Sequence, residues 1–496
     1  MASIYSAVPH VIVDTERRQG QVTVAESDCA CPLTLSSRSR AEAVTPAIFD
    51  QLFYQVPAAI MSGPADYTIF TSPYADAGIA VLNNHAVNLW RQFEKPCSPA
   101  TALHRLGIER EASAYQQAIT ALGESGFLCD TPETPIAFAH EDTLIAWLHT
   151  TNACNLRCNY CYLAKTNEMM DESIGGQAID AVFRSAMANG FSKLKIKYAG
   201  GEATLNFALV TRLHDYARQL AGEKNFSVDG VVLSNGVRLT REMIQSMLAR
   251  QLRLMISLDG LGQVHDAQRA FAGGRGSFAE VARHIEMAQS LGLTPDICVT
   301  VSGHSAAGLP DLIGWILKRD LPFSLNFYRE NELSTSFADL QLDEERIIQG
   351  MLAAFKVLER NLPRRSLLAS LIDRANLSAP HARPCAAGHN YLVIDHFGRV
   401  AKCQMEIDKP ITNIAAPDPL AVVRADRIGI QNLGVEEKAG CRDCEWKYWC
   451  AGGCPQATFR ATGRYDIKSP NCRIYKALYP EALRLEALRL IKFSPA

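Results

Sequence analysis

Hydrophobic positions in the central part of the chain follow two alternating patterns. Six short apolar runs predict buried strands: residues 144–149, 194–198, 231–234, 254–258, 297–301 and 323–327. Apolar residues at helical spacing, as in 179–187 and 278–291, lie between them. Repeated strand–helix units predict an α/β fold with a parallel sheet and right-handed crossovers. Six units are too few to close an eight-stranded barrel, so we expect a partial (β/α)6 barrel with its active site at the carboxyl ends of the strands.

A smaller pattern precedes this core. Residues 67–71 and 79–82 predict two strands, residues 85–93, 100–106 and 114–122 predict three helices, and residues 126–128 close the unit. This order is typical of a winged helix-turn-helix, a shape that often binds DNA. The last helix, however, contains no Lys or Arg to neutralise phosphates. We therefore expect no nucleic-acid partner.

The patterns predict five parts of the chain: an unassigned segment at 1–60, the winged-helix unit at 61–135, the core at 140–375, a loop-rich and cysteine-rich part at 380–480, and a C-terminal helix or tail at 481–496. A helical stretch is expected at 343–371 within the core. A Pro-containing acidic linker, residues 130–135, separates the winged-helix unit from the first core strand.

Composition narrows the location and the partners. The 496 residues allow about three domains, and 50 Lys and Arg against 52 Asp and Glu give no charge footprint for nucleic acid or an anionic membrane. The start of the chain lacks a signal-peptide pattern, and no run of 18 apolar residues occurs. We expect a cytoplasmic protein without a membrane partner. Its 15 cysteines would then be reduced, so clustered ones indicate metal ligands rather than disulfides.

The first cysteine group follows the first core strand directly. Cys154, Cys158 and Cys161 are spaced so that each could bind one iron of a cubane cluster, leaving the fourth iron open for a substrate or cofactor. The alternatives are unrelated cysteines in an exposed loop, or part of a zinc site whose fourth ligand lies elsewhere.

This C-x3-C-x2-C run after the first strand of a partial barrel resembles the radical SAM superfamily. Gly200, Gly201 and Glu202, at the end of the second strand, look like the family's glycine-rich motif. The resemblance implies that this motif receives the amino group of S-adenosylmethionine, and a glycine permits close approach because it has no Cβ. On its own the motif could be only a tight turn.

Four further residues match cofactor contacts of the family. By resemblance, Ser257 and Arg269 hold the ribose and carboxylate of S-adenosylmethionine, Ser234 lies in a turn near the cofactor, and Tyr160 packs on the adenine. Each has an ordinary reading as well. Ser257 could bond a neighbouring backbone group, Arg269 could form a surface ion pair, Ser234 could lie in a plain turn, and Tyr160 could pack in its loop.

The second cysteine group resembles the seven-cysteine SPASM domain, which carries two auxiliary iron–sulfur clusters. The resemblance implies one cluster on Cys441, Cys444, Cys450 and Cys472, and another on Cys385, Cys403 and Cys454. Seven ligands leave one iron without a cysteine, and His389 lies nearby in the sequence, although a lone loop histidine is more often uninvolved. A pair of zinc sites is the competing interpretation.

The resemblance implies an enzyme that cleaves S-adenosylmethionine reductively at a [4Fe-4S] cluster, with electrons from a donor such as flavodoxin or ferredoxin. The resulting radical removes a substrate hydrogen. The winged-helix unit resembles the recognition element of enzymes that modify ribosomally made peptides, in which a leader peptide adds as a strand beside the wing. We therefore expect a radical SAM/SPASM maturase that oxidatively crosslinks a precursor peptide or protein.

Three alternatives remain from the sequence. One is an anaerobic sulfatase-maturing enzyme that forms formylglycine, although some 150 residues precede Cys154 and Gln404 stands where that type has an aspartate. Another is a thioether-forming maturase of the quinohaemoprotein type. The third is a non-enzymatic iron–sulfur or zinc regulator built on the winged helix.

Overall fold

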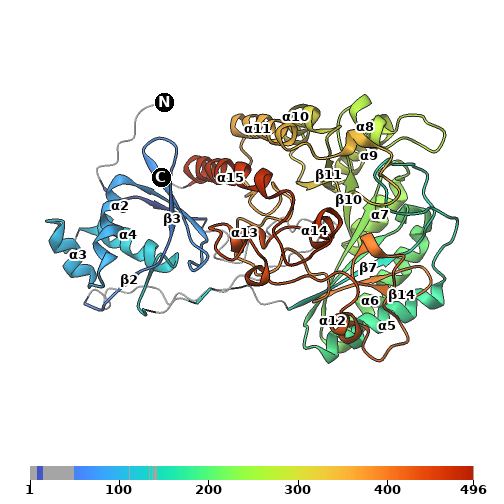
Figure 1. Ribbon diagram of the computed structural model, residues 1–496, viewed down its shortest axis with the longest axis horizontal. Coiled ribbons are helices and arrows are strands. Elements are labelled where there is room, and N and C mark those ends of the chain that lie inside the picture. Colours follow the sequence, from blue (N-terminus) through green and yellow to red (C-terminus); the bar gives the residue numbers. More distant parts are fainter. Residues whose placement is uncertain are drawn as a thin grey trace.

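The computed structural model describes residues 8–14, 50–110, 112–132, 135–136, 138 and 142–494. Its largest sheet has nine strands and lies in the right-hand part of the molecule in Figure 1. The strand order is β12-β11-β10-β9-β8-β7-β13-β14-β15. Six neighbouring strands are parallel and follow one another along the chain: β7 (Thr143–His149), β8 (Lys193–Ala199), β9 (Ser227–Ser234), β10 (Arg253–Ser257), β11 (Asp296–Val301) and β12 (Phe323–Phe327). The predicted α/β fold with a parallel core is confirmed.

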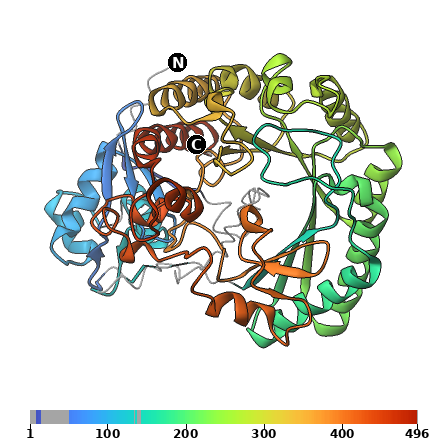
Figure 2. The ribbon, with the colours of Figure 1, turned by 45° about the vertical axis from the view of Figure 1, so that its right-hand side comes forward.

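Helices follow these strands and cover the outer face of the curved sheet (Figure 2). They are α5 (Glu172–Ala188), α6 (Phe207–Lys224), α7 (Arg241–Arg250), α8 (Gln263–Gln268), α9 (Phe278–Ser290), α10 (Leu309–Lys318) and α11 (Glu344–Arg360). Because successive strands are parallel, their carboxyl ends meet along one edge of the sheet. Short 3-10 turns lie at Gln92–Glu94, Ala203–Asn206, Ala306–Gly308, Ala338–Leu340, Gln404–Glu406 and Val435–Glu437.

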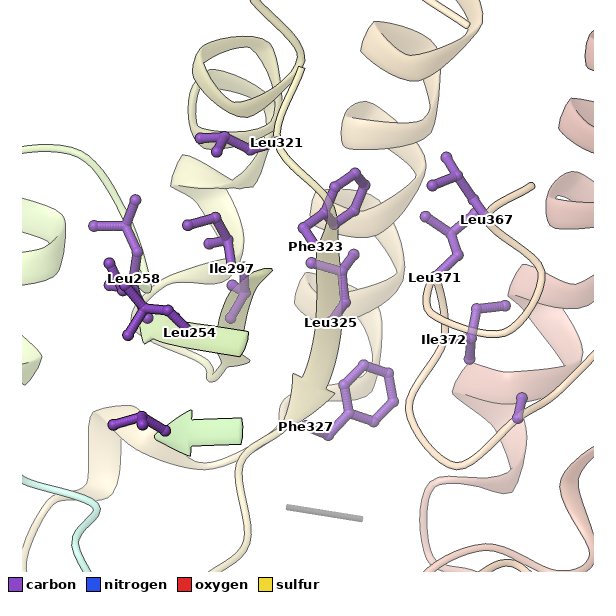
Figure 3. Packing of buried hydrophobic residues seen from close by; sticks show 14 of the residues in the cluster. Leu254, Leu258, Ile297, Leu321, Phe323, Leu325, Phe327, Leu367, Leu371 and Ile372 are labelled. Atoms are coloured by element: carbon purple, nitrogen blue, oxygen red, sulfur yellow. The ribbon is translucent and has the colours of Figure 1, made fainter. Parts of the chain in front are cut away.

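The last core strand shows how the interior is packed. Alternation along β12 places Phe323, Leu325 and Phe327 in the main apolar cluster, where they are buried (Figure 3). Leu367 and Leu371 cover them from a segment without regular helix. The core therefore depends on a loop as well as on helices.

The helix predicted over residues 343–371 is too long. Helix α11 ends at Arg360, and the residues after it form turns. Pro363 disfavours helical backbone at the residue before it and lacks the N–H that a continuing helix needs, so the helix stops ahead of it.

The cysteine-rich part is joined to the core sheet. Strand β13 (Tyr391–Ile394) pairs with β7 in parallel, and β14 (Arg399–Ala401) and β15 (Thr412–Asn413) extend the sheet in antiparallel pairing. Helices α12 (Pro419–Ala425), α13 (Lys447–Cys450) and α14 (Pro455–Thr462) follow, and α15 begins within the part predicted as loop-rich, at Cys472, and ends at Phe493. Sequence patterns missed these short strands, which are only two to four residues long.

The N-terminal unit is built on a four-stranded antiparallel sheet in the order β1-β5-β4-β3. Its elements are β1 (Val11–Ile12), β3 (Ala59–Ser62), β4 (Tyr67–Thr71), β5 (Ile79–Asn83), α2 (Asn84–Arg91), α3 (Pro99–Arg105), α4 (Ser113–Glu124) and a small ladder of β2 (Tyr54–Gln55) with β6 (Leu128–Cys129). The two strands and three helices predicted for this unit lie where the sequence placed them. Strands β1 and β2 and the start of β3 fall in the segment left unassigned, of which residues 1–7 and 15–49 lie outside the described residues.

Helix α15, near the C-terminal end of the described residues, packs against the N-terminal unit. It packs against β4 and β5, and Arg489 on it pairs with Glu486 at 2.7 Å and with Asp14 at 2.5 Å. Within the described part of the chain, no helix combines the length and apolarity that crossing a membrane requires.

Candidate functional site

A cavity of about 250 Å³ lies at the carboxyl ends of the parallel strands. All the residues that sequence patterns assigned to the radical site line it: Cys154, Cys158, Tyr160, Cys161, Gly200, Gly201, Glu202, Ser234, Ser257 and Arg269. These residues come from the loop after β7, from the ends of β8, β9 and β10, and from the end of α8, so the fold brings together positions that are up to 115 residues apart in the chain. Trp147 of β7, Asn326 of β12 and Arg329 of the loop after β12 also line it.

The loop after β7 that carries Cys154, Cys158 and Cys161, here called the cysteine loop, is bound to the end of β8 by backbone hydrogen bonds. The N–H of Gly201 donates to the carbonyl of Thr151 at 2.7 Å, and that of Glu202 donates to the carbonyl of Ala153 at 2.9 Å. A Cβ on Gly200 would lie 2.4 Å from the Thr151 carbonyl oxygen, and one on Gly201 would lie 2.3 Å from that of Ala153. The two glycines are therefore required for this close approach of two backbones, a reason that the sequence alone did not give.

The carboxylate of Glu202 ties the ends of β8 and β9 together. One oxygen accepts hydrogen bonds from the hydroxyls of Thr204 at 2.6 Å and Ser234 at 2.8 Å, and the other accepts from the backbone N–H of Asn235 at 2.6 Å. Glu202 is buried. A buried carboxylate needs several donors to offset lost hydration, and these three provide them from two elements.

Ser257, the last residue of β10, presents a free hydroxyl to the cavity. Its side chain has no hydrogen-bond partner among the residues that the structure describes, and it lines the cavity beside Cys298 of the neighbouring strand. The alternative in which this hydroxyl bonds a nearby backbone group is therefore not the arrangement observed. The hydroxyl is available to a bound molecule.

Arg269 forms a buried cluster with Tyr160 and Asp259. Its guanidinium donates to the hydroxyl of Tyr160, which donates to Asp259 at 2.6 Å, and it lies 3.6 Å from the same carboxylate. Arg269 is only 7% exposed, so it does not form the surface ion pair that was the alternative. Its Nε is buried and has no partner in the described residues, so it can donate to a ligand in the cavity.

Charges around the cysteine loop affect its thiols. Burial raises the pKa of Cys158 to about 11, and the neighbouring Arg269 opposes that rise. Burial also raises the pKa of Cys154. Burial alone would lower the pKa of Arg269. The opposing effect of Tyr160, Cys158 and Asp259 is larger, so the pKa is raised overall and the guanidinium stays charged. Thiol ligands must lose their protons to bind metal, and a fixed cation beside Cys158 favours that loss.

A second, smaller cavity of about 20 Å³ gathers part of the other cysteine group. Cys441, Cys444, Cys450 and Cys472 line it together with Trp446, Tyr475 and Tyr479. These are the four cysteines that the sequence resemblance assigned to one auxiliary cluster. The aromatic rings separate them from water on one side, which lowers the local dielectric.

The remaining three cysteines are buried elsewhere in the same part of the chain. Asn432 donates to the sulfur of Cys385 at 3.6 Å, and Arg329 donates through Nε to the sulfur of Cys454 at 3.2 Å. Burial raises the pKa of Cys454, but Arg329 and Arg374 lower it to below its ordinary value. Gln404, next to Cys403, lines the first cavity, as does Arg329, so this group lies beside the radical-site cavity.

His389, the histidine that lies near the second cysteine group in the sequence, has a backbone hydrogen-bond partner within the protein. Its Nε2 lies 3.2 Å from the carbonyl oxygen of Asn432, and burial lowers its pKa to about 4. Among the described residues, no three His, Cys, Asp or Glu side chains lie close enough to hold a single metal ion.

Sequence reasoning missed several residues that line the cavity, and two of them were missed for a common reason. Arg329 and Asn326 lie at and beyond the end of β12, in a stretch without a recognisable motif, and only the fold brings them to the cavity. One signal could have found them. They lie at or just after the end of a predicted core strand, and functional residues gather at the carboxyl ends of such strands. Arg329 is also held by Asp373, at 2.7 Å.

Known proteins resemble this chain over its core. The family model of the radical SAM superfamily matches residues 148–316. The chain is 22% identical over 325 residues to a serine-type anaerobic sulfatase-maturating enzyme of Klebsiella aerogenes, a match that covers 61% of this chain and 77% of that protein. It is 25% identical over 269 residues to the antilisterial bacteriocin subtilosin biosynthesis protein AlbA of Bacillus subtilis, covering 53% of this chain and 55% of that protein.

A solved structure has a similar fold. The structure of native anSMEcpe with bound AdoMet and Cp18Cys peptide aligns with a TM-score of 0.59 at 17% sequence identity, covering 70% of this chain and 99% of that one. The sequence-based prediction of a radical SAM enzyme is confirmed, and S-adenosylmethionine and a [4Fe-4S] cluster are the cofactors of that group. Residues 148–316 of the chain therefore form a radical SAM domain.

Proposed function

We propose that the chain is a radical SAM maturase that oxidatively crosslinks a ribosomally made peptide or protein. The observation that carries this proposal is the single cavity into which the strand ends bring the three spaced cysteines, the unpartnered hydroxyl of Ser257 and the unpartnered Nε of Arg269. When bound there, the cluster and S-adenosylmethionine supply a carbon radical that removes a hydrogen atom from the substrate.

The residues of the cavity suit these two groups. Cys154, Cys158 and Cys161 would hold three irons of a cubane, as their spacing predicts. Ser257 and Arg269 offer a hydroxyl and a cation to the polar groups of S-adenosylmethionine. Glu202 already accepts hydrogen bonds on both oxygens, so its first role is to fix the shape of the pocket.

Tyr160 has a polar anchor in this pocket. Its hydroxyl is bonded to both Asp259 and Arg269, which fixes the ring orientation at the cavity wall. We assign to it the packing on the adenine that the family resemblance implies.

The second cysteine group would hold two auxiliary clusters. The shared small cavity supports Cys441, Cys444, Cys450 and Cys472 as ligands of one cluster, and Cys385, Cys403 and Cys454 would hold the other. Crosslinking removes two hydrogens from the substrate: the radical takes one as an atom, and the other leaves as a proton and an electron. An auxiliary cluster beside the cavity can accept that electron.

The N-terminal unit supplies a candidate docking edge for the substrate. Within the described residues, β3 pairs only with β4, which leaves its other edge open, and Ile60 on β3 is 48% exposed. An extended peptide can add to an open strand edge through backbone hydrogen bonds. The relative AlbA is a subtilosin biosynthesis protein, which agrees with a peptide as substrate class.

Sulfatase maturation is the second candidate, because a sulfatase-maturating enzyme is among the relatives. Gln404 is the observation against it. This amide lines the radical-site cavity at the position where the sulfatase type has an aspartate, and it accepts a hydrogen bond from Tyr391 at 3.1 Å. An amide cannot take a proton from a substrate, whereas a carboxylate can.

Replacing Cys154 by Ala should abolish reductive cleavage of S-adenosylmethionine and leave the auxiliary clusters in place, since Cys154 lines only the larger cavity. Release of 5′-deoxyadenosine under dithionite and EPR spectra of anaerobically reconstituted protein measure the two effects. Cys129→Ala, outside both cysteine groups, is the matched control. Wild-type rates in Cys154→Ala would contradict the assignment of the radical site.

Replacing Ser257 by Ala should weaken binding of S-adenosylmethionine roughly 3- to 10-fold, the effect of losing one hydrogen bond of about 1 kcal/mol. Equilibrium binding to the reconstituted protein measures this change. Ser290→Ala on the exposed end of α9 should leave affinity unchanged. Equal affinity in the Ser257 variant and the wild type would remove this hydroxyl from the cofactor site.

The product distinguishes the two candidate functions. A precursor peptide encoded beside the gene should lose the mass of two hydrogens per crosslink and should not react with a hydrazide. Formylglycine made from Ser loses the same mass but carries an aldehyde that a hydrazide labels. A labelled product would therefore decide for the sulfatase type, and tandem mass spectrometry would locate the modified residue.

Replacing Ile60 by Asp should weaken binding of the precursor peptide, because it places a charge on the edge strand proposed to bind it. Cleavage of S-adenosylmethionine should stay intact, because Ile60 is not among the residues that line the cavity. Fluorescence anisotropy of a labelled leader peptide measures the affinity. Ile428→Asp, at a 95% exposed isoleucine outside this unit, is the control. If both variants bind the leader as the wild type does, β3 is not the docking edge.

A further inference from the structure

Lys438 is a buried cation without a carboxylate partner. It is 1% exposed, and its ammonium donates to the backbone carbonyl of Ala451 at 2.8 Å. No carboxylate pairs with it among the residues that the structure describes. Lys402 in the same part of the chain is also buried, but it pairs with Asp426 at 2.7 Å. Burial of an unpaired charge is strongly unfavourable, so Lys438 lacks the counter-charge that its location requires.

The groups around Lys438 are cysteines. The backbone N–H of Cys441 donates to the carbonyl of Lys438 at 3.1 Å, and Ala451, which receives the ammonium, directly follows Cys450. On another side, the N–H of Val435 donates to the carbonyl of Ala382 at 2.9 Å, which brings the segment leading to Cys385 alongside.

Both proposed auxiliary clusters contribute to this environment. Burial lowers the pKa of Lys438, whereas four thiols raise it: Cys441 and Cys450 of the four-cysteine set, and Cys385 and Cys454 of the three-cysteine set. The geometry agrees: the ammonium binds the carbonyl of Ala451, and a Cβ on Gly452 would lie 3.0 Å from it, so it lies against the segment that joins Cys450 of one set to Cys454 of the other.

The backbone leaves room for this side chain. Gly452 has a φ of +81°, and a Cβ there would lie 2.5 Å from Cδ of Lys438. A side chain at position 452 would thus displace the lysine as well as strain the turn. The absence of a side chain on Gly452 therefore provides the space that the Lys438 side chain occupies.

We propose that Lys438 is the shared counter-charge of the two auxiliary clusters and raises the reduction potential of both. The inference rests on the proposed function, because it requires the auxiliary clusters. Cysteine-ligated iron–sulfur clusters are anionic, and each becomes more negative on reduction. A fixed cation nearby stabilises the reduced state more than the oxidised state, and low local dielectric strengthens the effect. Lys438 is a positioning residue in this role, since it contacts no substrate.

The test compares midpoint potentials by EPR-monitored redox titration of the full-length, reconstituted protein. Lys438→Gln removes the charge and keeps a donor for the Ala451 carbonyl, and Lys438→Arg keeps the charge. In Lys438→Gln both auxiliary potentials should shift to more negative values while that of the radical cluster stays unchanged. In Lys438→Arg they should stay close to those of the wild type.

Lys476→Gln is the matched control. Lys476 lines the smaller cavity and affects the thiol of Cys472, but it is exposed, so solvent screens its charge. A shift as large as that of Lys438→Gln in this control would overturn the special role of the buried lysine, as would unchanged potentials in Lys438→Gln.

Cluster assembly provides a second measurement. Loss of auxiliary iron in Lys438→Gln with retention in Lys438→Arg supports the counter-charge, whereas loss in both variants assigns Lys438 to packing and overturns the inference. Iron content and EPR of the wild type separate this result from the proposed function. If the wild type contains no auxiliary clusters, both the proposed function and the inference about Lys438 are wrong. If the wild type contains them, the Lys438 variants test the inference about Lys438 alone.

Discussion

The buried carboxylate of Glu202 is the constraint on which the radical-site cavity depends. It draws Ser234 and Asn235 at the end of β9 toward the end of β8, and the backbone beside it holds the cysteine loop. The second connection requires two backbones to approach closely, which explains the two glycines before Glu202. Three separate elements are thus fixed relative to one another before any cofactor binds, and a radical reaction benefits from such fixed geometry because it limits side reactions.

The architecture could be read from the sequence where its pattern is local. Core strands such as 323–327 are short apolar runs between helices, and the spacing of Cys154, Cys158 and Cys161 is itself a chemical pattern. The addition of β13 to the sheet could not be read in this way. Its partner β7 precedes it by more than 240 residues, and a four-residue strand carries no periodicity of its own. Arg329 escaped for the same reason, since only tertiary structure takes it to the cavity.

Three buried or partly buried cations lie close to cysteines of the two groups. Arg269 acts on Cys158 at the radical site, Arg329 donates to Cys454, and Lys438 lies among thiols of both auxiliary sets. Arg269 and Arg329 each also pair with a carboxylate, and this offsets their charge in part. A near-neutral chain therefore contains local positive charge beside several of these cysteines, and the overall charge gave no indication of it.

The two cavities are joined by a row of aromatic rings. Phe327 lines the larger cavity and stacks on Tyr475 with ring centroids 5.8 Å apart, Tyr475 stacks on Tyr479 at 6.2 Å, and Tyr479 meets Trp446 at 5.0 Å beside the four cysteines. Tyr475 and Tyr479 are buried between the two cavities. Both tyrosines come from α15, the helix that also packs against the N-terminal sheet, so one helix contacts both the unit proposed to bind the peptide and the aromatic row between the two cavities.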